Sequence, residues 1–448
     1  MSRRESTRFL MTVMNNAIIL LSKYYVSCDF LGIFAQQNTL KTYKTILSKT
    51  TMDFISQRLQ ALSPSATLAM SQKSSELKAQ GIDVINLSVG EPDFFTPDHI
   101  KEAAKKAVDD NFSFYSPVPG YLSLRQAISD KLKNENGVDY APEQIVVGNG
   151  AKQSLCNTVL CLVNHGDEVI IPTPAWVSYV QMVNLCGGKS VLVPAAIDQD
   201  FKITPEQLEN AITEKTKLII LCSPSNPSGS IYSRDELAGL AAVLARHPQV
   251  MIIADEIYEH INYVGKHESL AQFPEIKDRV AIINGVSKAY AMTGWRIGYV
   301  AAPLWLAKAV NKLQGQYTSG ASSIAQKAAE AAYRGSQQCV EDMRVAFQRR
   351  RDLITGLLQE IPGIELKVPH GAFYVFPKVE SFFGKKCGDT VINDANDLAI
   401  YLLEKAHVAS VAGDAFCCPG YLRMSYATSD ENLIEAVARI KAALAELK

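Results

Sequence analysis

Six short runs of aliphatic residues alternate with helical segments in this chain of 448 residues, and this alternation constrains the fold more than any other feature. Because these runs are almost continuously apolar, we expect a mostly parallel sheet with helices on both faces. Ligands of such sheets bind at the carboxyl ends of the strands. The predicted strands are 145–147, 168–171, 190–193, 218–221, 250–254 and 280–283, and helices among them include 152–163 and 233–246.

The pattern changes on both sides of this region. A helix is predicted over 65–80 with Gly81 as its stop, then a strand over 84–89. Thr96 is a candidate N-cap for the following helix, with Pro97 in its first turn. After residue 340 the sequence predicts a smaller α+β unit, with helices at 340–359, 397–405 and the C-terminus and strands at 372–376 and 422–426.

Composition excludes several classes of function. The formal net charge is −1, so there is no basic field for nucleic acid or for a membrane surface. No apolar run is long enough to span a bilayer. The nine cysteines form no C-x-x-C pair and the seven histidines no H-x-x-x-H pattern, so we expect free, buried thiols, a reducing compartment and no metal site.

Residues 1–51 differ from the rest, with seven basic and two acidic residues and no clear period. An arginine-rich, acid-poor leader has this composition, so an organelle-targeting peptide is one interpretation. A secretory leader is a second, although no A-x-A site follows the apolar stretch. We favour a third, that Met52 begins the functional chain, that 1–51 is an extension outside the working protein, and that the protein is cytoplasmic.

Lys288 lies in the segment Ser287-Lys288-Ala289-Tyr290, just after the apolar strand 280–283. A lysine there is held at a cleft, where partial desolvation lowers its pKa as a Schiff base requires. Arg296, eight residues later, can bind an anion such as a cofactor phosphate. A surface loop with one lysine and one arginine is the alternative.

Two polar segments follow other strand ends. Asp255 is the first polar residue after the strand 250–254, so we expect it to be buried and to need a cationic partner, unless it is a helix N-cap. A protonated pyridine nitrogen would supply that cation. Tyr258 can point its hydroxyl into the same site, and Asn226 is an amide donor in a rigid turn that contains Pro224 and Pro227.

Three further features give weaker evidence for a ligand site when each is taken alone. The small residues of Gly148-Asn149-Gly150-Ala151 precede a helix, whose free N–H groups and dipole can bind phosphate. Arg423 lies in an apolar strand and needs a carboxylate, either a ligand's or one in an internal salt bridge. Trp176 can stack on an aromatic ligand or fill the core.

Together, the segments 223–229, 255–258, 287–298 and 423–427 resemble the fold type I pyridoxal-phosphate aminotransferases, most closely the class I aspartate aminotransferases of the bacterial, thermophile-type subgroup. The resemblance covers Met52 to the C-terminus. It implies an α/β large domain with a mostly parallel seven-stranded sheet and a smaller α+β domain from both chain ends. The implied division is an extension (1–51), an arm with part of the small domain (52–98), a large cofactor domain (99–339) and a small domain (340–448).

The resemblance also implies roles for single residues. Lys288 forms the Schiff base and then moves the substrate proton, Asp255 pairs with the pyridinium, and Tyr258 and Asn226 bond the phenolic oxygen. Trp176 stacks on the ring, and Tyr115 reaches the phosphate of the neighbouring subunit, so the enzyme is a homodimer. The implied phosphate holders are Gly150, Ala151, Ser287 and Arg296, and Lys152 is implied as a further cofactor contact.

Substrate contacts are implied as well. Arg423 grips the α-carboxylate, helped by Gly90 and Asn226. Lys152, with Ser65 or Thr67 nearby, faces the distal carboxylate of a dicarboxylic substrate. An exposed lysine at a helix start is the alternative for Lys152. The sequence departs from the family at Ala175, where relatives often have an aromatic residue, and at 411–414, which lack a proline-glycine pair.

The implied reaction transfers the amino group of aspartate to 2-oxoglutarate by a ping-pong route, giving oxaloacetate and glutamate. Prephenate or aromatic amino-acid transamination at the same site is the first alternative. A lyase or synthase that uses the same cofactor is the second. A non-enzymatic pyridoxal-phosphate sensor is the third, although residues 1–51 are too short for a DNA-binding module and lack a helix-turn-helix pattern.

Overall fold

The computed structural model describes residues 54–448. Two compact units divide the chain, one ending at Gln60 and the other spanning Ala61–Lys448. In the first unit, α3 (Gln57–Gln60) is a single helical turn. All other elements belong to the second unit. The predictions for residues 1–51, and for Met52 as the functional start, lie outside the described residues.

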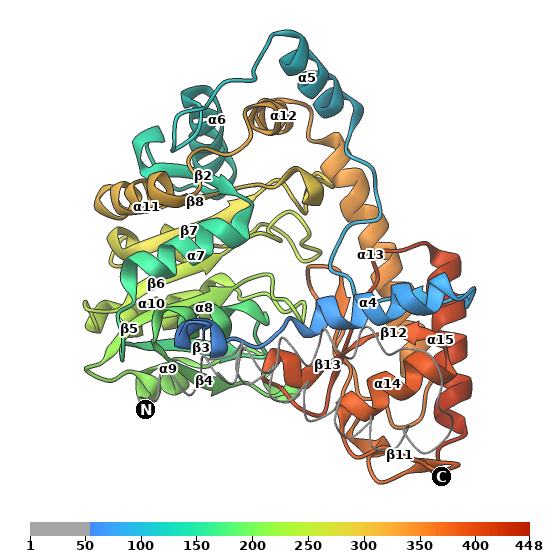
Figure 1. The fold of residues 1–448 in the computed structure, drawn as a ribbon. Coiled ribbons are helices and arrows are strands. Elements are labelled where there is room, and N and C mark those ends of the chain that lie inside the picture. The colour runs from blue at the N-terminus through green and yellow to red at the C-terminus, as the bar shows by residue number, and fades with distance from the viewer. Residues whose placement is uncertain (1–53) are drawn as a thin grey trace, which may run out of the picture. The chain divides into compact units, whose positions relative to one another are not determined.

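A seven-stranded sheet forms the centre of the second unit, in the order β2-β8-β7-β6-β5-β3-β4 (Figure 1). β8 runs antiparallel to both of its neighbours, and all other neighbouring pairs are parallel. The predicted mostly parallel sheet and its six predicted strands are confirmed. β8 was not predicted. The strands are β2 (Ile145–Asn149), β3 (Glu168–Thr173), β4 (Lys189–Pro194), β5 (Thr216–Cys222), β6 (Met251–Asp255), β7 (Val280–Gly285) and β8 (Ile297–Ala301).

Helices cover both faces of this sheet, as the apolar strands predict. Along β6, Ile252 and Ala254 face one hydrophobic cluster, whereas Met251 and Ile253 face another. The first cluster draws on α5 (Asp98–Asp109), α6 (Leu122–Lys131), α10 (Arg234–Arg246) and α12 (Ser323–Arg334). The second draws on α7 (Ala151–Leu162), α8 (Ser178–Cys186) and α11 (Leu304–Tyr317). Successive side chains of a strand thus point to opposite faces of the sheet and contribute to two separate hydrophobic cores.

Local signals set several helix boundaries. Ser233 caps α10, because its hydroxyl accepts from the Glu236 N–H at 3.3 Å while the Glu236 carboxylate accepts from the Ser233 N–H at 2.7 Å. The prediction of Thr96 as an N-cap is wrong. Pro97 occupies that position, and the Thr96 hydroxyl instead donates to the Ala291 carbonyl at 2.8 Å. This tertiary hydrogen bond replaces the local cap.

The smaller part of the unit has its own sheet and core. β9 (Tyr374–Val375) and β13 (Val411–Ala412) both pair antiparallel with β14 (Leu422–Ser425). The predicted strand 84–89 shrinks to β1 (Ile85–Asn86), which pairs parallel with β12 (Val408–Ala409). One hydrophobic cluster joins Ile85 and Leu87 to α13 (Gln338–Gln359), α14 (Ala395–Lys405) and α15 (Asp430–Ala445). The domain boundaries predicted at 98 and 339 stay predictions.

Two features bear on the environment of the chain. The eight cysteines that the structure describes are free, as expected, but all are half-buried rather than buried. No helix within residues 54–448 is long and apolar enough to cross a membrane.

Candidate active site

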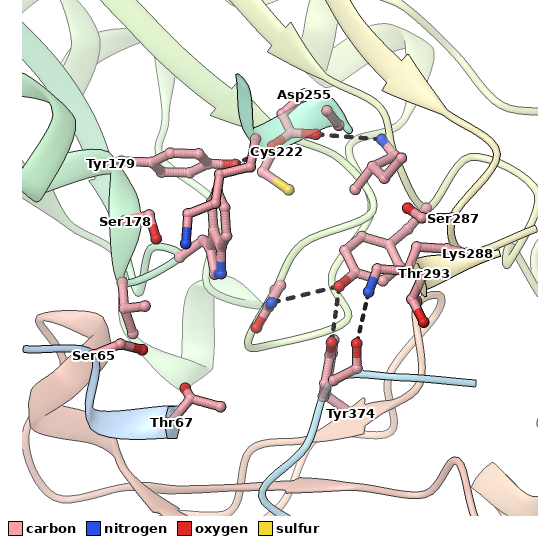
Figure 2. Close-up of a pocket in the computed structure, with 18 of the residues that line it drawn as sticks. Ser65, Thr67, Ser178, Tyr179, Cys222, Asp255, Ser287, Lys288, Thr293 and Tyr374 are labelled. Atoms are coloured by element: carbon pink, nitrogen blue, oxygen red, sulfur yellow. Dashed lines mark hydrogen bonds between the residues drawn. The ribbon is translucent and has the colours of Figure 1, made fainter. Parts of the chain in front are cut away.

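A cavity of about 380 Å³ opens where β5, β6 and β7 reach their carboxyl ends. It brings together thirteen of the residues named from the sequence: Ser65, Thr67, Gly90, Ala151, Lys152, Trp176, Asn226, Asp255, Tyr258, Ser287, Lys288, Arg296 and Arg423. Figure 2 shows lining side chains around this space, among them Asp255, Lys288 and Tyr374. Segments more than three hundred residues apart thus meet at one end of the sheet.

Lys288 follows the end of β7 by three residues and is partly buried. Its Nζ donates a 2.6 Å hydrogen bond to the Gly90 carbonyl (Figure 2). Burial lowers the pKa of Lys288 to about 8, against the opposing charge of Glu91 and with help from Arg296. A much larger neutral fraction of this amine is therefore available near neutral pH than for a solvent-exposed lysine.

Asp255 is the last residue of β6 and is only 5% exposed, so the predicted burial is confirmed. Its Oδ2 accepts a 2.7 Å hydrogen bond from the Tyr179 hydroxyl, and its Oδ1 a 3.3 Å bond from the Ile257 N–H. Burial raises the pKa of Asp255 to about 6, and the Tyr179 hydrogen bond opposes this rise. Within residues 54–448 no cationic side chain forms an ion pair with it. The carboxylate is thus arranged for a cation that a ligand would bring.

A group of hydroxyl and amide side chains lies on the other side of the cavity. The Tyr258 and Tyr374 hydroxyls are 2.8 Å apart, and the Asn226 amide donates to Tyr258 at 3.5 Å. All three residues are buried. They offer hydrogen bonds to an oxygen atom of a ligand bound in this cavity.

Arg423 is 1% exposed on β14. Its Nη1 donates to Asn226 Oδ1 at 3.1 Å, its Nη2 donates to the Ser88 carbonyl, and its guanidinium lies 4.6 Å from the Tyr374 ring centre. No carboxylate of the described chain pairs with it, and its Nε has no hydrogen-bond partner there. The alternative of an internal salt bridge is therefore wrong for this part of the chain. A buried guanidinium without an acid is a site for an anionic ligand.

The N-terminus of α7 forms a cradle beside Arg296. Gly150 precedes the helix with φ +82°, and a Cβ there would come within 2.5 Å of Arg296 Nη2. Arg296 Nη1 donates to the Thr293 carbonyl at 2.9 Å, and the described residues give it no acidic partner. Ser287 is buried and lines the same cavity. Free N–H groups, a guanidinium and a hydroxyl together suit a phosphate group.

Lys152 lines the cavity from the first turn of α7, with Ser65 and Thr67 among the other lining residues. Its Nζ lies 5.1 Å from the Trp176 ring centre, within range of a cation–π contact. Burial and the nearby charge of Arg296 lower the pKa of Lys152. No carboxylate of the described chain forms a salt bridge with it. Trp176 in turn packs edge-on against Tyr179, with ring centres 5.5 Å apart.

One predicted site residue lies apart from the others. Tyr115 does not line the cavity and is 98% exposed, beside the exposed Phe114. Conversely, Tyr179, Cys222 and Tyr374 line the cavity and were not named from the sequence. Tyr374 falls in the predicted strand 372–376, where its hydroxyl is the one polar side-chain group. The sequence around Tyr179 and Cys222 carries no comparable signal.

These residues fit the cofactor that the resemblance implies. Pyridoxal phosphate carries a phosphate, a basic ring nitrogen, a phenolic oxygen and an aldehyde. The α7 cradle suits the phosphate, and Asp255, which has no cationic partner among the described residues, suits the ring nitrogen. The Asn226–Tyr258 pair suits the phenolic oxygen, and the Lys288 amine suits the aldehyde. Arg423 remains free for a carboxylate of a second ligand.

A phosphate cradle, a desolvated lysine and a cation-free buried carboxylate at the end of a mostly parallel sheet define a class of cofactor-dependent group-transfer enzymes. Comparison with known families gives the particular one. The family model "Aminotransferase class I and II" matches residues 82–440, and the chain belongs to this family.

Individual relatives agree with the family assignment. The chain is 48% identical to an aspartate/prephenate aminotransferase of Nitrosomonas europaea over 394 residues, covering 87% of this chain and 99% of the relative. A bifunctional aspartate and glutamate/aspartate-prephenate aminotransferase of Petunia hybrida is 47% identical over 88% of this chain and 83% of its own length. The crystal structure of an aspartate aminotransferase from Rhizobium meliloti matches with a TM-score of 0.85 and 43% identity, covering 88% of this chain and 99% of that one.

Proposed function

We propose that this aminotransferase uses pyridoxal phosphate to transfer the amino group of L-aspartate to 2-oxoglutarate, giving oxaloacetate and L-glutamate in two alternating half-reactions. One observation carries the choice of substrate. Besides Arg296, which we assign to the phosphate, two cationic side chains without acidic partners among the described residues, Arg423 and Lys152, line the same cavity as Lys288. A dicarboxylic amino acid can pair with both. The names of the Rhizobium and Nitrosomonas relatives support the same substrate.

Lys288 carries the proton chemistry in this proposal. Pyridoxal phosphate, when bound, supplies an electron sink for the charge that develops on the substrate Cα. Lys288 is the residue whose amine would hold the cofactor, through its aldehyde carbon and with loss of water, until a substrate amine takes its place. With substrate bound, the free Lys288 amine would accept the proton of the substrate Cα and later give it up again. Its pKa near 8 leaves it able both to accept and to give up that proton.

The remaining polar groups hold the cofactor. Asp255, fixed by Tyr179, would pair with the ring nitrogen and keep it protonated. Asn226 and Tyr258 would bond the phenolic oxygen, and Trp176, which lines the same cavity, would stack on the ring. The phosphate would be held by Arg296 with the backbone N–H groups of Gly150, Ala151 and Lys152 and the hydroxyl of Ser287.

Arg423 and Lys152 orient the substrate. Arg423 binds the α-carboxylate, with the Gly90 backbone and Asn226 beside it. Lys152 faces the distal carboxylate, and Ser65 or Thr67 completes that end. Together these contacts present the Cα–H bond to Lys288.

We propose a homodimer in which the exposed Tyr115 reaches the cofactor phosphate of the partner subunit. A 98% exposed tyrosine beside an exposed phenylalanine suits a surface that a second copy covers. The division into an arm (52–98), a large domain (99–339) and a small domain (340–448), and a cytoplasmic location, are part of the same proposal.

Prephenate is a second candidate acceptor, because the Nitrosomonas and Petunia relatives are named for it as well as for aspartate. Prephenate carries two carboxylates, so Arg423 and Lys152 serve it equally well. A pair of assays separates the candidates, with aspartate as donor and either 2-oxoglutarate or prephenate as acceptor. Comparable kcat/KM values for both acceptors would make the protein bifunctional.

A substrate screen tests the main proposal. Oxaloacetate should form from aspartate and 2-oxoglutarate, and glutamate should form in equal amount. An apolar or aromatic amino acid should react more slowly than aspartate. Consumption of aspartate without glutamate would point to a lyase or synthase instead, and faster reaction of an aromatic donor would overturn the substrate assignment.

A further inference from the structure

A cluster of buried charged residues lies behind Asp255, and the proposed reaction uses none of them. Glu256 follows Asp255 directly in the chain, and Glu259, Lys131 and His267 complete the cluster. Their exposed fractions are 3%, 6%, 4% and 8% in that order. Burial of four ionisable groups at one place costs stability unless their charges are matched.

The Glu259 carboxylate already has an ion-pair partner and two hydrogen-bond donors. Lys131 forms a close ion pair with it, and the side-chain amides of Asn136 and Asn284 each donate to it at 2.6 Å. Glu256, Glu259 and His267 place ligand atoms within 4.8 Å of one another, a spacing that would suit a cation. The Lys131 ammonium already supplies the positive charge there, so we assign no metal site to this cluster.

Glu256 pairs instead with His267. The His267 Nε2 lies 3.2 Å from Glu256 Oε2, without the alignment of a hydrogen bond, and the Ser269 hydroxyl donates to Glu256 Oε1. Burial lowers the pKa of His267, but the charges of Glu256 and Glu259 outweigh it, so the pKa of His267 is raised despite Lys131 nearby. Glu135 and His260 lie 3.0 Å apart and approach Lys131 at 3.8 Å and Glu259 at 3.7 Å, respectively. Among the four buried groups themselves, two carboxylates and one ammonium are balanced only if His267 is protonated.

The pairing matters because Glu256 is a neighbouring negative charge for Asp255. That charge adds to the burial that raises the pKa of Asp255. A carboxylate that loses its charge no longer binds a pyridinium. A cation on Glu256 would therefore protect the charge of Asp255.

We propose that His267 is a positioning residue for the cofactor, acting through Glu256. Its imidazolium neutralises the carboxylate behind Asp255, and Asp255 stays ionised toward the cofactor ring nitrogen. The inference rests on the proposed function, since it concerns the hold of Asp255 on pyridoxal phosphate.

The test compares cofactor affinity in matched variants. The dissociation constant of pyridoxal phosphate is measured from its visible absorbance in the full chain, above the usual pKa of histidine. His267→Gln leaves Glu256 unpaired, and we expect affinity to fall about tenfold. Glu256→Gln removes the interfering charge and should leave affinity unchanged or slightly higher. The double variant E256Q/H267Q should return to the wild-type value.

A purely structural role gives a different pattern. If H267Q, E256Q and the double variant all weaken binding alike, or if H267Q binds like the wild type, the inference is overturned. His247→Gln is the matched control, because His247 lies 2.9 Å from Glu209 and contacts no member of the cluster. Thermal unfolding reports whether each variant is folded. A wild-type chain that does not bind pyridoxal phosphate would refute the proposed function rather than this inference.

Discussion

The Tyr179 hydroxyl donates a 2.7 Å hydrogen bond to Asp255, and this bond joins the first turn of α8 to the end of β6. Asp255 has no cationic partner among the described residues, so Tyr179 is its main stabilising neighbour. A hydrogen bond to a charged group is stronger than one between neutral groups. Tyr179 therefore helps to keep the carboxylate ionised inside a buried site.

Tyr179→Phe removes this bond and keeps the ring. Loss of a hydrogen bond to a charged group costs about 1.5–3 kcal/mol, so we expect cofactor affinity to fall at least about tenfold. The loss should grow as pH falls, because the pKa of Asp255, already raised by burial, rises further. Titration of the variant with pyridoxal phosphate at several pH values measures this. Tyr232→Phe, at a buried tyrosine that does not line this cavity, is the control.

Arg423→Lys keeps the positive charge but loses the ability to form bidentate hydrogen bonds. We expect kcat/KM for aspartate to fall about 100-fold, or ~3 kcal/mol, because a lysine cannot bind the carboxylate with two parallel bonds. Cofactor affinity should change little, since Arg423 faces the substrate. Steady-state kinetics and cofactor titration together check this, and equal losses in both would contradict the role.

Lys152→Ala should change specificity. The distal carboxylate of aspartate loses its cation, so kcat/KM for aspartate should fall about tenfold, or ~1.4 kcal/mol, more than for alanine. Lys133→Ala, at an exposed lysine in a surface ion pair, is the matched control and should leave both values unchanged. Equal losses for the two amino acids would remove the specificity role from Lys152.

The amine of Lys288 should be unusually reactive in the cofactor-free protein. Burial lowers its pKa to about 8, so the neutral, nucleophilic fraction grows as pH rises through about 8 rather than 10.5. Competitive labelling with a small acylating reagent, read by peptide mass spectrometry across pH, gives the midpoint directly. A midpoint near that of an exposed lysine would show that the site does not desolvate the amine.

The same shift has a consequence for stability. The pKa of Lys288 is lower in the folded state than in the unfolded chain. Between about pH 8 and pH 10.5, the unfolded chain therefore binds more protons than the folded protein. The unfavourable contribution of Lys288 is fully present below this window and disappears as pH rises through it. In the cofactor-free protein, Lys288→Met should therefore raise the free energy of unfolding near neutral pH and lose this advantage at high pH. Denaturant unfolding of both proteins at two pH values would detect the change, and an equal difference at both would contradict it.

Much of the fold was predictable because the buried strands are short aliphatic runs with polar residues at their ends. The burial of Asp255 was predictable for this reason, since Asp255 is the first polar residue after such a run. β8 escaped prediction because it begins directly after Arg296, whose left-handed conformation ends one turn and starts the strand. A Cβ on Gly298 would collide with the Ala151 backbone, and this close approach appears only in three dimensions.

The residues that line the cavity were also only partly predictable from the sequence. Lys288, Asp255 and Asn226 are marked by their places at strand ends, but Tyr179 contacts Asp255 across 76 positions of sequence. The Thr96 hydroxyl likewise bonds Ala291 across 195 positions instead of capping its own helix. Such contacts depend on packing between distant segments, and no local pattern encodes them.

The central claim is that Lys288 bonds to the aldehyde of pyridoxal phosphate. The most direct measurement is to mix the full chain with pyridoxal phosphate, reduce the product with borohydride, and locate the label by peptide mass spectrometry. We predict one labelled peptide, modified at Lys288, and no stoichiometric label in Lys288→Ala. A label on another lysine, or none on Lys288 at saturating cofactor, would contradict the account.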